Sequence, residues 1–272
     1  MKKKNRVKNI ILGILTVLVI LIFSFPFLWM LLASFKTQAQ IMSTEDVLLF
    51  KPTFDNYKSV FEQYDFLDFI VNSLVVAVVS TIGSLLLGLP AAYAIARYKM
   101  QKLSLVILVA RIVPGITFLI PWYILFSKIG LVDTYTALIL SHMLVGLPFI
   151  IWVMMSFFEG LPHEIEEAGL IDGATKSQVF LKIIMPISGP GVITSSLLSF
   201  IFSWNNFMFS IILAGDKTKT LPVAVFNFIS YSETNWGALM AAACIITLPV
   251  LIIALVAQRY IVSGLAAGAV KG

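Results

Sequence analysis

The sequence has 272 residues, of which 59% are hydrophobic and 12% are charged, and its mean hydropathy is +0.97. Soluble domains carry about 25% charged residues, so this composition excludes an ordinary soluble protein and indicates a chain that crosses a membrane several times. The net charge of +5 is no sign of a nucleic-acid partner, and we expect none. The single cysteine, Cys244, excludes an intramolecular disulfide and a cysteine-based metal site, and we expect no bound metal.

Six apolar segments are long enough to cross a bilayer. Residues 1–9 form a basic head, and the apolar run after them is either a signal peptide or a first span. Its length, and the lack of an A-x-A-like cleavage pattern after it, favour a span. The predicted spans cover residues 10–33, 69–96, 103–126, 135–158, 187–214 and 237–260, within a single transmembrane domain over residues 1–272 that ends in a short tail at 261–272. The third span is expected to be broken by Arg111, Pro114-Gly115 and Pro121. A short interfacial helix is expected at residues 54–63.

The basic residues predict the orientation of these spans. Twelve Lys and Arg side chains lie on the side of the N-terminus and six on the opposite side. Because short cytoplasmic loops are enriched in Lys and Arg, we expect both termini, and the segment at residues 159–186, in the cytoplasm.

Residues 159–186 are far more polar than the segments around them. Pro162 is expected at a first helical position, followed by acidic residues at 164–167, which suit the positive end of a helix dipole. Gly173 is a typical helix stop, Thr175 begins the T-x-x-Q capping box of a second helix, and Pro186 is expected to end that helix. The pattern therefore predicts two short helices joined by a glycine turn. The plainer alternative is a solvated helical loop.

A polar stripe marks the fifth span. Ser195, Ser199, Ser203, Asn206 and Ser210 recur at helical spacing, with Trp204 and Asn205 beside them. In lipid such side chains would be unsatisfied, so the stripe is expected to face protein or a water-filled path. Two roles remain open: close helix packing, and a path for a hydroxyl-rich solute.

Three further features of the chain have two interpretations each. Arg111 lies within the third span. Its charge is either functional or paired, or its side chain reaches toward the cytoplasmic interface. No acidic residue lies within the predicted spans. His142, in the fourth span, is more typical of a helix–helix hydrogen bond than of a ligand site. The loop at residues 215–236 is either a solvated connector or a contact surface for an external partner.

Several enzyme motifs are missing from the sequence. It contains no G-x-x-x-x-G-K-[ST] phosphate loop, no H-E-x-x-H and no G-x-S-x-G. We therefore expect a chain that is not an enzyme and binds no cofactor. If ATP drives transport, another subunit must hydrolyse it.

Residues 159–186 resemble the EAA loop of ABC-importer permeases: E-A-A, three residues, Gly, nine residues, I-x-L-P. We therefore call them the coupling segment. Glu167, Ala168 and Gly169 match E-A-A, Gly173 falls in register, and Ile183, Met185 and Pro186 match the end, with Gly in place of the second Ala and Met in place of Leu. The resemblance implies a coupling helix that docks in a groove of an ATPase subunit. The residues implied in coupling are Glu166, Glu167, Ala168, Gly169, Asp172, Gly173, Ala174 and Pro186.

Other segments are similar to the MalG-like carbohydrate branch of that family. They are the ending GLAAGAVKG, and FKPTFDNY, NSL, PAAYA and FSWNNF at residues 50–57, 72–74, 90–94 and 202–207. The resemblance implies an all-α, six-span type I importer permease in a bacterial or archaeal cell membrane. Its implied partners are a second permease subunit, two ATPase subunits that hold ATP and Mg, and an extracytoplasmic solute-binding protein.

The resemblance also implies roles for particular residues. The tail residues Gly268, Ala269, Val270, Lys271 and Gly272 would insert between the ATPases, and Lys217, Lys219, Asn227, Tyr231 and Asn235 would contact the binding protein. The candidate solute path comprises Arg111, Ser199, Ser203, Trp204, Asn205 and Asn206. In the maltose system, however, most sugar contacts come from the partner permease.

The expected function is that of a permease subunit of an ATP-driven sugar importer. A polyol or glycerol phosphate is the alternative solute. A secondary transporter, which usually uses intramembrane acids, and an intramembrane hydrolase built on His142 are the alternatives from other classes.

Overall fold

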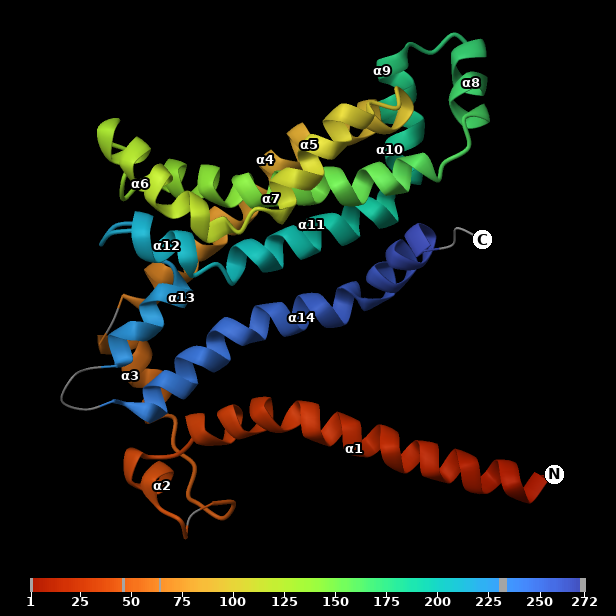
Figure 1. Cartoon of the computed structure of the whole chain (residues 1–272). Helices are drawn as coiled ribbons and strands as arrows, with labels where there is room; N and C mark the ends of the chain where they lie inside the picture. The colour runs from red at the N-terminus through yellow and green to blue at the C-terminus, as the bar shows by residue number, and fades with distance from the viewer. Residues whose placement is uncertain (1, 46, 64, 230–233, 270–272) are drawn as a thin grey trace. The chain divides into compact units, whose positions relative to one another are not determined.

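The computed structural model describes residues 2–45, 47–63, 65–229 and 234–269, and in these parts it is helical, with one isolated bridge between Ile229 and Thr234. The fold class predicted from the sequence is therefore confirmed. In chain order the longer helices are α1 (Lys2–Ser34), α3 (Asp55–Gln63), α4 (Phe66–Arg97), α5 (Gln101–Ile112), α6 (Leu119–Lys128), α7 (Tyr135–Glu159), α8 (Glu164–Ile171), α11 (Gly189–Trp204), α12 (Met208–Leu213) and α14 (Trp236–Ala269) (Figure 1). Short helical pieces, α2 (Gln38–Met42), α9 (Lys176–Val179), α10 (Met185–Ile187) and α13 (Leu221–Ala224), connect them.

Four of these helices are apolar and long enough to cross a membrane alone: Lys8–Ser34, Phe66–Arg97, Tyr135–Glu159 and Trp236–Val256. Two bent pairs bring the number to six if each counts as one span, Gln101–Ile112 with Gly115–Lys128 at 89°, and Lys176–Ile187 with Gly189–Trp204 at 77°. The second pair overlaps the predicted fifth span only over residues 187–204, because its first arm belongs to the coupling segment. The first bend follows the interruption expected at Pro114, because proline cannot donate to the helix and restricts the residue before it.

The fifth predicted span, residues 187–214, is not one helix. It ends at Trp204 and resumes at Met208 as α12. Asn205 donates from Nδ2 to the carbonyl of Ile201 (3.0 Å), and the Oδ1 of Asn206 accepts from the backbone N–H of Phe209 (3.0 Å). Asparagine side chains that bond the local backbone in this way compete with helical hydrogen bonds. The polar stripe therefore does not share one helix face, as the spacing predicted, because its last two members lie beyond the break.

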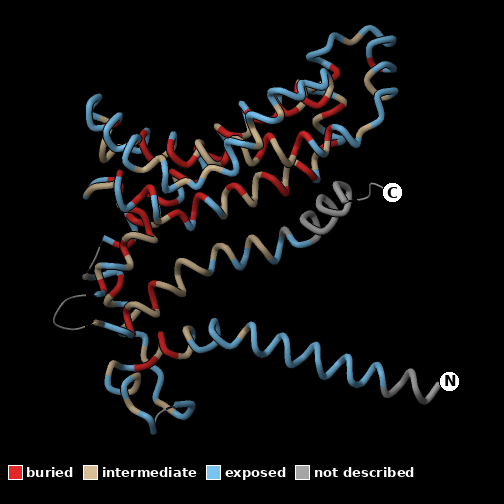
Figure 2. The backbone as a smooth tube through the Cα atoms, in the orientation of Figure 1, coloured by how far each residue is buried: buried red, intermediate tan, exposed pale blue. Residues whose placement is uncertain are grey.

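The chain divides into two compact units, and each is described separately. The first comprises residues 1–66 and 225–248. Most of α1 is exposed along its apolar length (Figure 2), while its C-terminal end is held by a cluster in which Ser34 Oγ and Tyr57 OH are hydrogen-bonded at 2.8 Å. Asn56 Nδ2 donates to the carbonyls of Ser34 and Lys36, at 2.8 Å each. A helix is present where one was expected at residues 54–63, as α3, which begins at Asp55.

The second unit comprises residues 67–224 and 249–272, and its core lies between α4, α7 and α11. Ser80 of α4, His142 of α7 and Ser203 of α11 meet there. Ser203 Oγ lies 2.6 Å from His142 Nδ1 and 3.1 Å from Ser80 Oγ. His142 thus makes the helix–helix hydrogen bond that its position in an apolar span favours.

Asp133 ties the turn between α6 and α7 to the loop after α12. Its Oδ1 accepts from the N–H of Gly215 (2.9 Å) and from both the N–H and the hydroxyl of Thr218 (3.1 and 2.8 Å), and its Oδ2 accepts from Lys217 N–H (3.4 Å). Burial raises the pKa of this carboxyl, but these hydrogen bonds outweigh burial, so its pKa lies below the ordinary value. The loop is therefore stabilised by the ionised form of Asp133.

We predict that Asp133→Asn lowers the free energy of unfolding by about 1–3 kcal/mol at neutral pH, because hydrogen bonds to a charged acceptor are lost. Asn tolerates the φ of +59° found at this position, so the change tests the charge. A depressed pKa means that the stabilisation is complete above the unfolded-state value of about 3.9 and is lost as the pH falls through the folded-state pKa.

The melting temperatures of wild type and Asp133→Asn, measured in detergent from pH 7 to pH 3, should therefore converge below about pH 4. Asp216→Asn, an exposed change in the same loop, is the control and should leave the melting temperature unchanged. A gap between wild type and Asp133→Asn that stays constant down to pH 3 would contradict the assignment.

Candidate functional site

The coupling segment folds as the two short helices expected from the sequence, at the end of α7 and α11 opposite to α6 and α12 (Figure 1). At the end of α8, the N–H of Ala174 donates to Gly169 O (3.0 Å) and the N–H of Gly173 to Leu170 O (3.1 Å). This pair of bonds is a Schellman motif, which needs a left-handed residue at Gly173. Its φ of +87° meets that requirement.

The two ends of the coupling segment differ slightly from the prediction. Helix α8 begins at Glu164, so Pro162 precedes the helix by two residues instead of opening it. Thr175 and Gln178 form the predicted capping box, but the helix then widens into a π-helical turn, η2 (Phe180–Ile184), and continues through Pro186 to Ile187. The wider turn accommodates a proline, whose ring clashes with the carbonyl four residues earlier in a regular helix.

The packing around residue 169 explains why this chain has Gly where the EAA pattern has Ala. A Cβ at this position would lie 2.6 Å from Ile183 Cδ1 and 3.2 Å from Val179 Cγ2. Gly169 is buried, and the lack of a side chain lets α8 pack directly on α9 and η2. The loss of about 1 kcal/mol in helix propensity relative to Ala is offset by this close packing.

The remaining side chains of α8 divide between an outer and an inner face. Glu167, Leu170 and Ile171 are exposed, Ile171 to 85%. The sequence did not single out Leu170 and Ile171; the signal was two apolar residues in the last turn of a short polar helix. Such an exposed apolar patch on a polar loop is typical of a protein contact.

Glu166 points inward, to the end of α4. Tyr93 OH donates to Glu166 Oε2 (2.7 Å), Arg97 Nε pairs with Glu166 Oε1, and Arg97 Nη1 donates to the carbonyl of Leu161 (3.1 Å). The Arg97 side chain is 6% exposed and that of Glu166 is 14% exposed. No role was predicted for Tyr93 or Arg97, although Tyr93 lies in the PAAYA segment at residues 90–94. Their spacing of four residues at the end of a span, which places both on one helix face, was a further signal.

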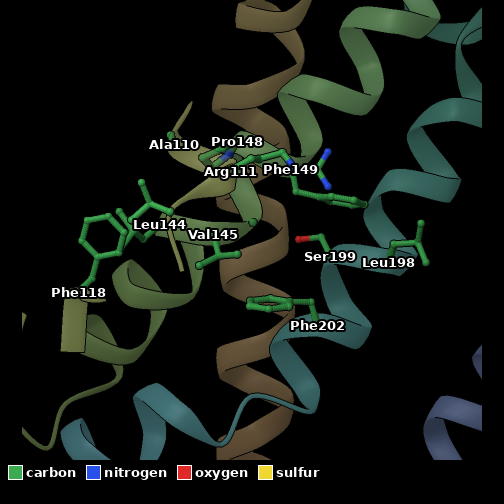
Figure 3. Close-up of a pocket in the computed structure, with 12 residues that line it drawn as sticks. Ala110, Arg111, Phe118, Leu144, Val145, Pro148, Phe149, Leu198, Ser199 and Phe202 are labelled. Atoms are coloured by element: carbon green, nitrogen blue, oxygen red, sulfur yellow. The ribbon is translucent and has the colours of Figure 1, made fainter. Parts of the chain in front are cut away.

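A cavity of about 470 Å³ lies between the α5–η1–α6 bend and helices α7 and α11, where η1 is a 3₁₀ turn over Gly115–Phe118 (Figure 3). Arg111 lies over the ring of Phe149, with its Cζ 5.3 Å from the ring centroid. Ser199 and Phe202, both on α11, also line the cavity. In Figure 3, Ser199 lies between Phe149 and Phe202. The wall is therefore mostly apolar and aromatic, with one guanidinium and one hydroxyl.

The structure brings only two residues of the expected solute path to this cavity, Arg111 and Ser199. Ser203 is bonded to His142 and Ser80 within the core, and Trp204 is buried. The two asparagines, 205 and 206, hold the break after α11. Most of the polar stripe therefore serves helix packing, which was one of the two roles left open.

The structure also describes most of the remaining candidate residues. Lys217 is exposed, and Lys219 Nζ lies 6.0 Å from the ring centroid of Phe69. In the other unit, Asn235 Oδ1 accepts from the N–H of Ala238 (3.0 Å), and Asn227 is partly buried. Tyr231 and the tail residues Val270, Lys271 and Gly272 are outside the described residues, while Gly268 and Ala269 end α14. Among the described residues, no group of three His, Cys, Asp or Glu side chains could hold a metal ion.

Apolar spans with a capped helix–glycine–helix segment at one end are the arrangement that the resemblance to ABC-importer permeases implies. Residues 84–266 match the family described as the binding-protein-dependent transport system inner membrane component. The chain belongs to this family.

Characterised relatives match nearly the whole chain. The trehalose transport system permease protein SugB of Mycobacterium tuberculosis (strain CDC 1551 / Oshkosh) is 36% identical, over 91% of this chain and 92% of that protein. The trehalose/maltose transport system permease protein MalG of Thermococcus litoralis (strain ATCC 51850 / DSM 5473 / JCM 8560 / NS-C) is 34% identical, over 99% of each. A chain of a bacterial ABC transporter involved in the import of the acidic polysaccharide alginate has the same fold, with a TM-score of 0.80, 21% identity, and coverage of 94% of this chain and 97% of that one.

We predict that Gly169→Val loosens the packing of α8 by about 1–3 kcal/mol, because its methyl groups overlap Ile183 and Val179. Limited proteolysis should then cut within residues 159–186 several times faster than in wild type. Gly189→Val is the matched control, since a Cβ there meets no atom within 4 Å. Equal cleavage rates in the two variants would contradict this packing account.

Proposed function

We propose that this chain is one of two permease subunits of an ATP-driven sugar importer in a bacterial or archaeal cell membrane. Membership of the family of binding-protein-dependent inner membrane components supports the transport role. Two relatives that match over nine-tenths of the chain or more are named for trehalose or maltose, which favours a sugar over a polyol or glycerol phosphate. Membership of this family also argues against a secondary transporter and an intramembrane hydrolase.

The observation that carries the proposal is the outer face of α8. Glu167, Leu170 and Ile171 are presented on a short helix whose end is set by the Gly173 turn and whose inner face is packed. An exposed apolar patch with an acidic neighbour suits a groove on an ATPase subunit. ATP and Mg are then bound by the ATPase, and this chain contributes no catalytic residue.

The orientation of the chain fits this arrangement. The excess of Lys and Arg on the N-terminal side favours a cytoplasmic location for both termini and for the coupling segment. The loop after α12, with Lys217 and Lys219, is then extracytoplasmic and available to a solute-binding protein. The last residues, from Gly268 to Gly272, are on the cytoplasmic side with the ATPases.

The cavity beside Arg111 is the part of this subunit suited to contact the solute. Sugar rings present C–H faces that stack on aromatic rings and hydroxyls that accept or donate hydrogen bonds. Phe149 and Phe202 supply aromatic surface, and Arg111 and Ser199 supply polar groups. A second permease subunit would close the open side of the path.

A graded series at Gly173 tests the coupling role. Gly173→Val places a β-branched residue at φ +87°, which such residues rarely adopt, whereas Gly173→Asn is better tolerated there. In the complex purified with its native partner subunits, we expect Gly173→Val to abolish sugar uptake and solute-stimulated ATP hydrolysis, with a smaller loss for Gly173→Asn. Full activity of an assembled Gly173→Val complex would contradict the proposal.

The substitution Arg111→Gln tests whether the cavity contacts the solute. Losing hydrogen bonds from a charged donor to the solute is worth about 1–2 kcal/mol, which corresponds to a roughly five- to thirty-fold rise in the KM for sugar uptake. Basal ATP hydrolysis should not change, because the coupling segment is untouched. Lys128→Gln, at the end of α6, serves as control. An unchanged KM in Arg111→Gln would remove this cavity from the solute path.

A further inference from the structure

We draw a more specific inference, which rests on the proposed function. We propose that Tyr93, Arg97 and Glu166, which we call the Glu166 clamp, form the joint through which movement of α8 is passed to α4. Tyr93 and Arg97 are thus positioning residues for transport, and Glu166 acts in coupling by holding the permease itself, while its neighbour Glu167 faces outward.

The contacts of the clamp converge on one carboxylate. Both oxygens of Glu166 are engaged, Oε2 by Tyr93 OH at 2.7 Å and Oε1 by Arg97 Nε. Arg97 also donates to the carbonyl of Leu161, in the turn that leads into α8. Helix α8 is therefore fastened to α4 both at its first turn and just before it.

Burial makes the ion pair costly to break. With the Arg97 side chain 6% exposed and that of Glu166 14% exposed, water screens the pair little, and removing either partner would leave the other charge buried without it. Among the described residues, no other hydrogen bond or ion pair joins α8 to a span. The packing of α8 on α9 and η2 stays within the coupling segment.

Tyr93 extends the joint to two more elements. Its ring lies 5.7 Å from that of Phe158, on α7, and 4.9 Å from that of Phe180, in η2, between centroids. The same helix, α4, carries Ser80, which bonds Ser203 in the core. Movement of α8 is thus passed through α4 to the contact between α4 and α11. On α11 this contact lies one helical turn from Ser199, which lines the cavity.

The test measures the ratio of sugar transported to ATP hydrolysed by the complete complex in proteoliposomes. For Glu166→Gln and Arg97→Gln, we expect the ratio to fall at least tenfold while ATP hydrolysis stays within twofold of wild type, because α8 still follows the ATPase but no longer carries α4. Glu164→Gln, an exposed acid in the same first turn, is the matched control and should keep the wild-type ratio. A purely structural role would lower both activities together.

Ratios within twofold of wild type in assembled Glu166→Gln and Arg97→Gln complexes would overturn the inference. If neither variant assembles, Tyr93→Phe decides, since it removes one hydroxyl and keeps the ion pair and the ring. We expect it to lower the ratio at least twofold, and an unchanged ratio would again overturn the inference. Failure of the wild-type complex to couple uptake to ATP would instead count against the proposed function.

Discussion

A polar group that leaves water for an apolar surrounding must find a partner, and this constraint organises the second unit. Ser203 hydrogen-bonds both His142 Nδ1 and Ser80 where α4, α7 and α11 meet. The buried carboxylate of Glu166 is satisfied by Tyr93 and Arg97 at the end of the same α4. The polar contacts therefore lie at the points where helices must keep their relative positions.

The two candidate functional regions are separated along these helices. The coupling segment lies at one end of α7 and α11, and the cavity lies further along them, beside Arg111, Phe149 and Ser199 (Figures 1 and 3). For an ATPase to drive transport through this chain, the two regions must be rigidly connected and the coupling segment must contact the partner. The capped Gly173 turn and the close packing at Gly169 hold the coupling segment rigid, and in the proposed transporter its exposed apolar face would form the contact.

Much of this arrangement could be predicted from the sequence, because it depends on local rules. Apolar runs give the spans, Gly173 and the Thr175–Gln178 box give the turn, and the prolines of residues 114–121 give the broken third span. The break at Asn205 and Asn206 was missed because helical periodicity does not reveal when a side chain will bond the backbone. The partner of Glu166 was missed because Arg97 is 69 residues away in the sequence, and such long-range pairing leaves no local pattern.

The central claim is that this chain moves solute only as part of an ATP-driven complex. The most direct test is uptake of radiolabelled trehalose or maltose into proteoliposomes that contain this chain alone, or the chain with its partner permease, ATPase and solute-binding protein, each with and without ATP and with and without a sodium or proton gradient. We expect uptake only from the complete complex with ATP, and no effect of the gradients. Uptake by the chain alone, driven by an ion gradient, would contradict the account and would make the Arg111 cavity the site of a secondary carrier.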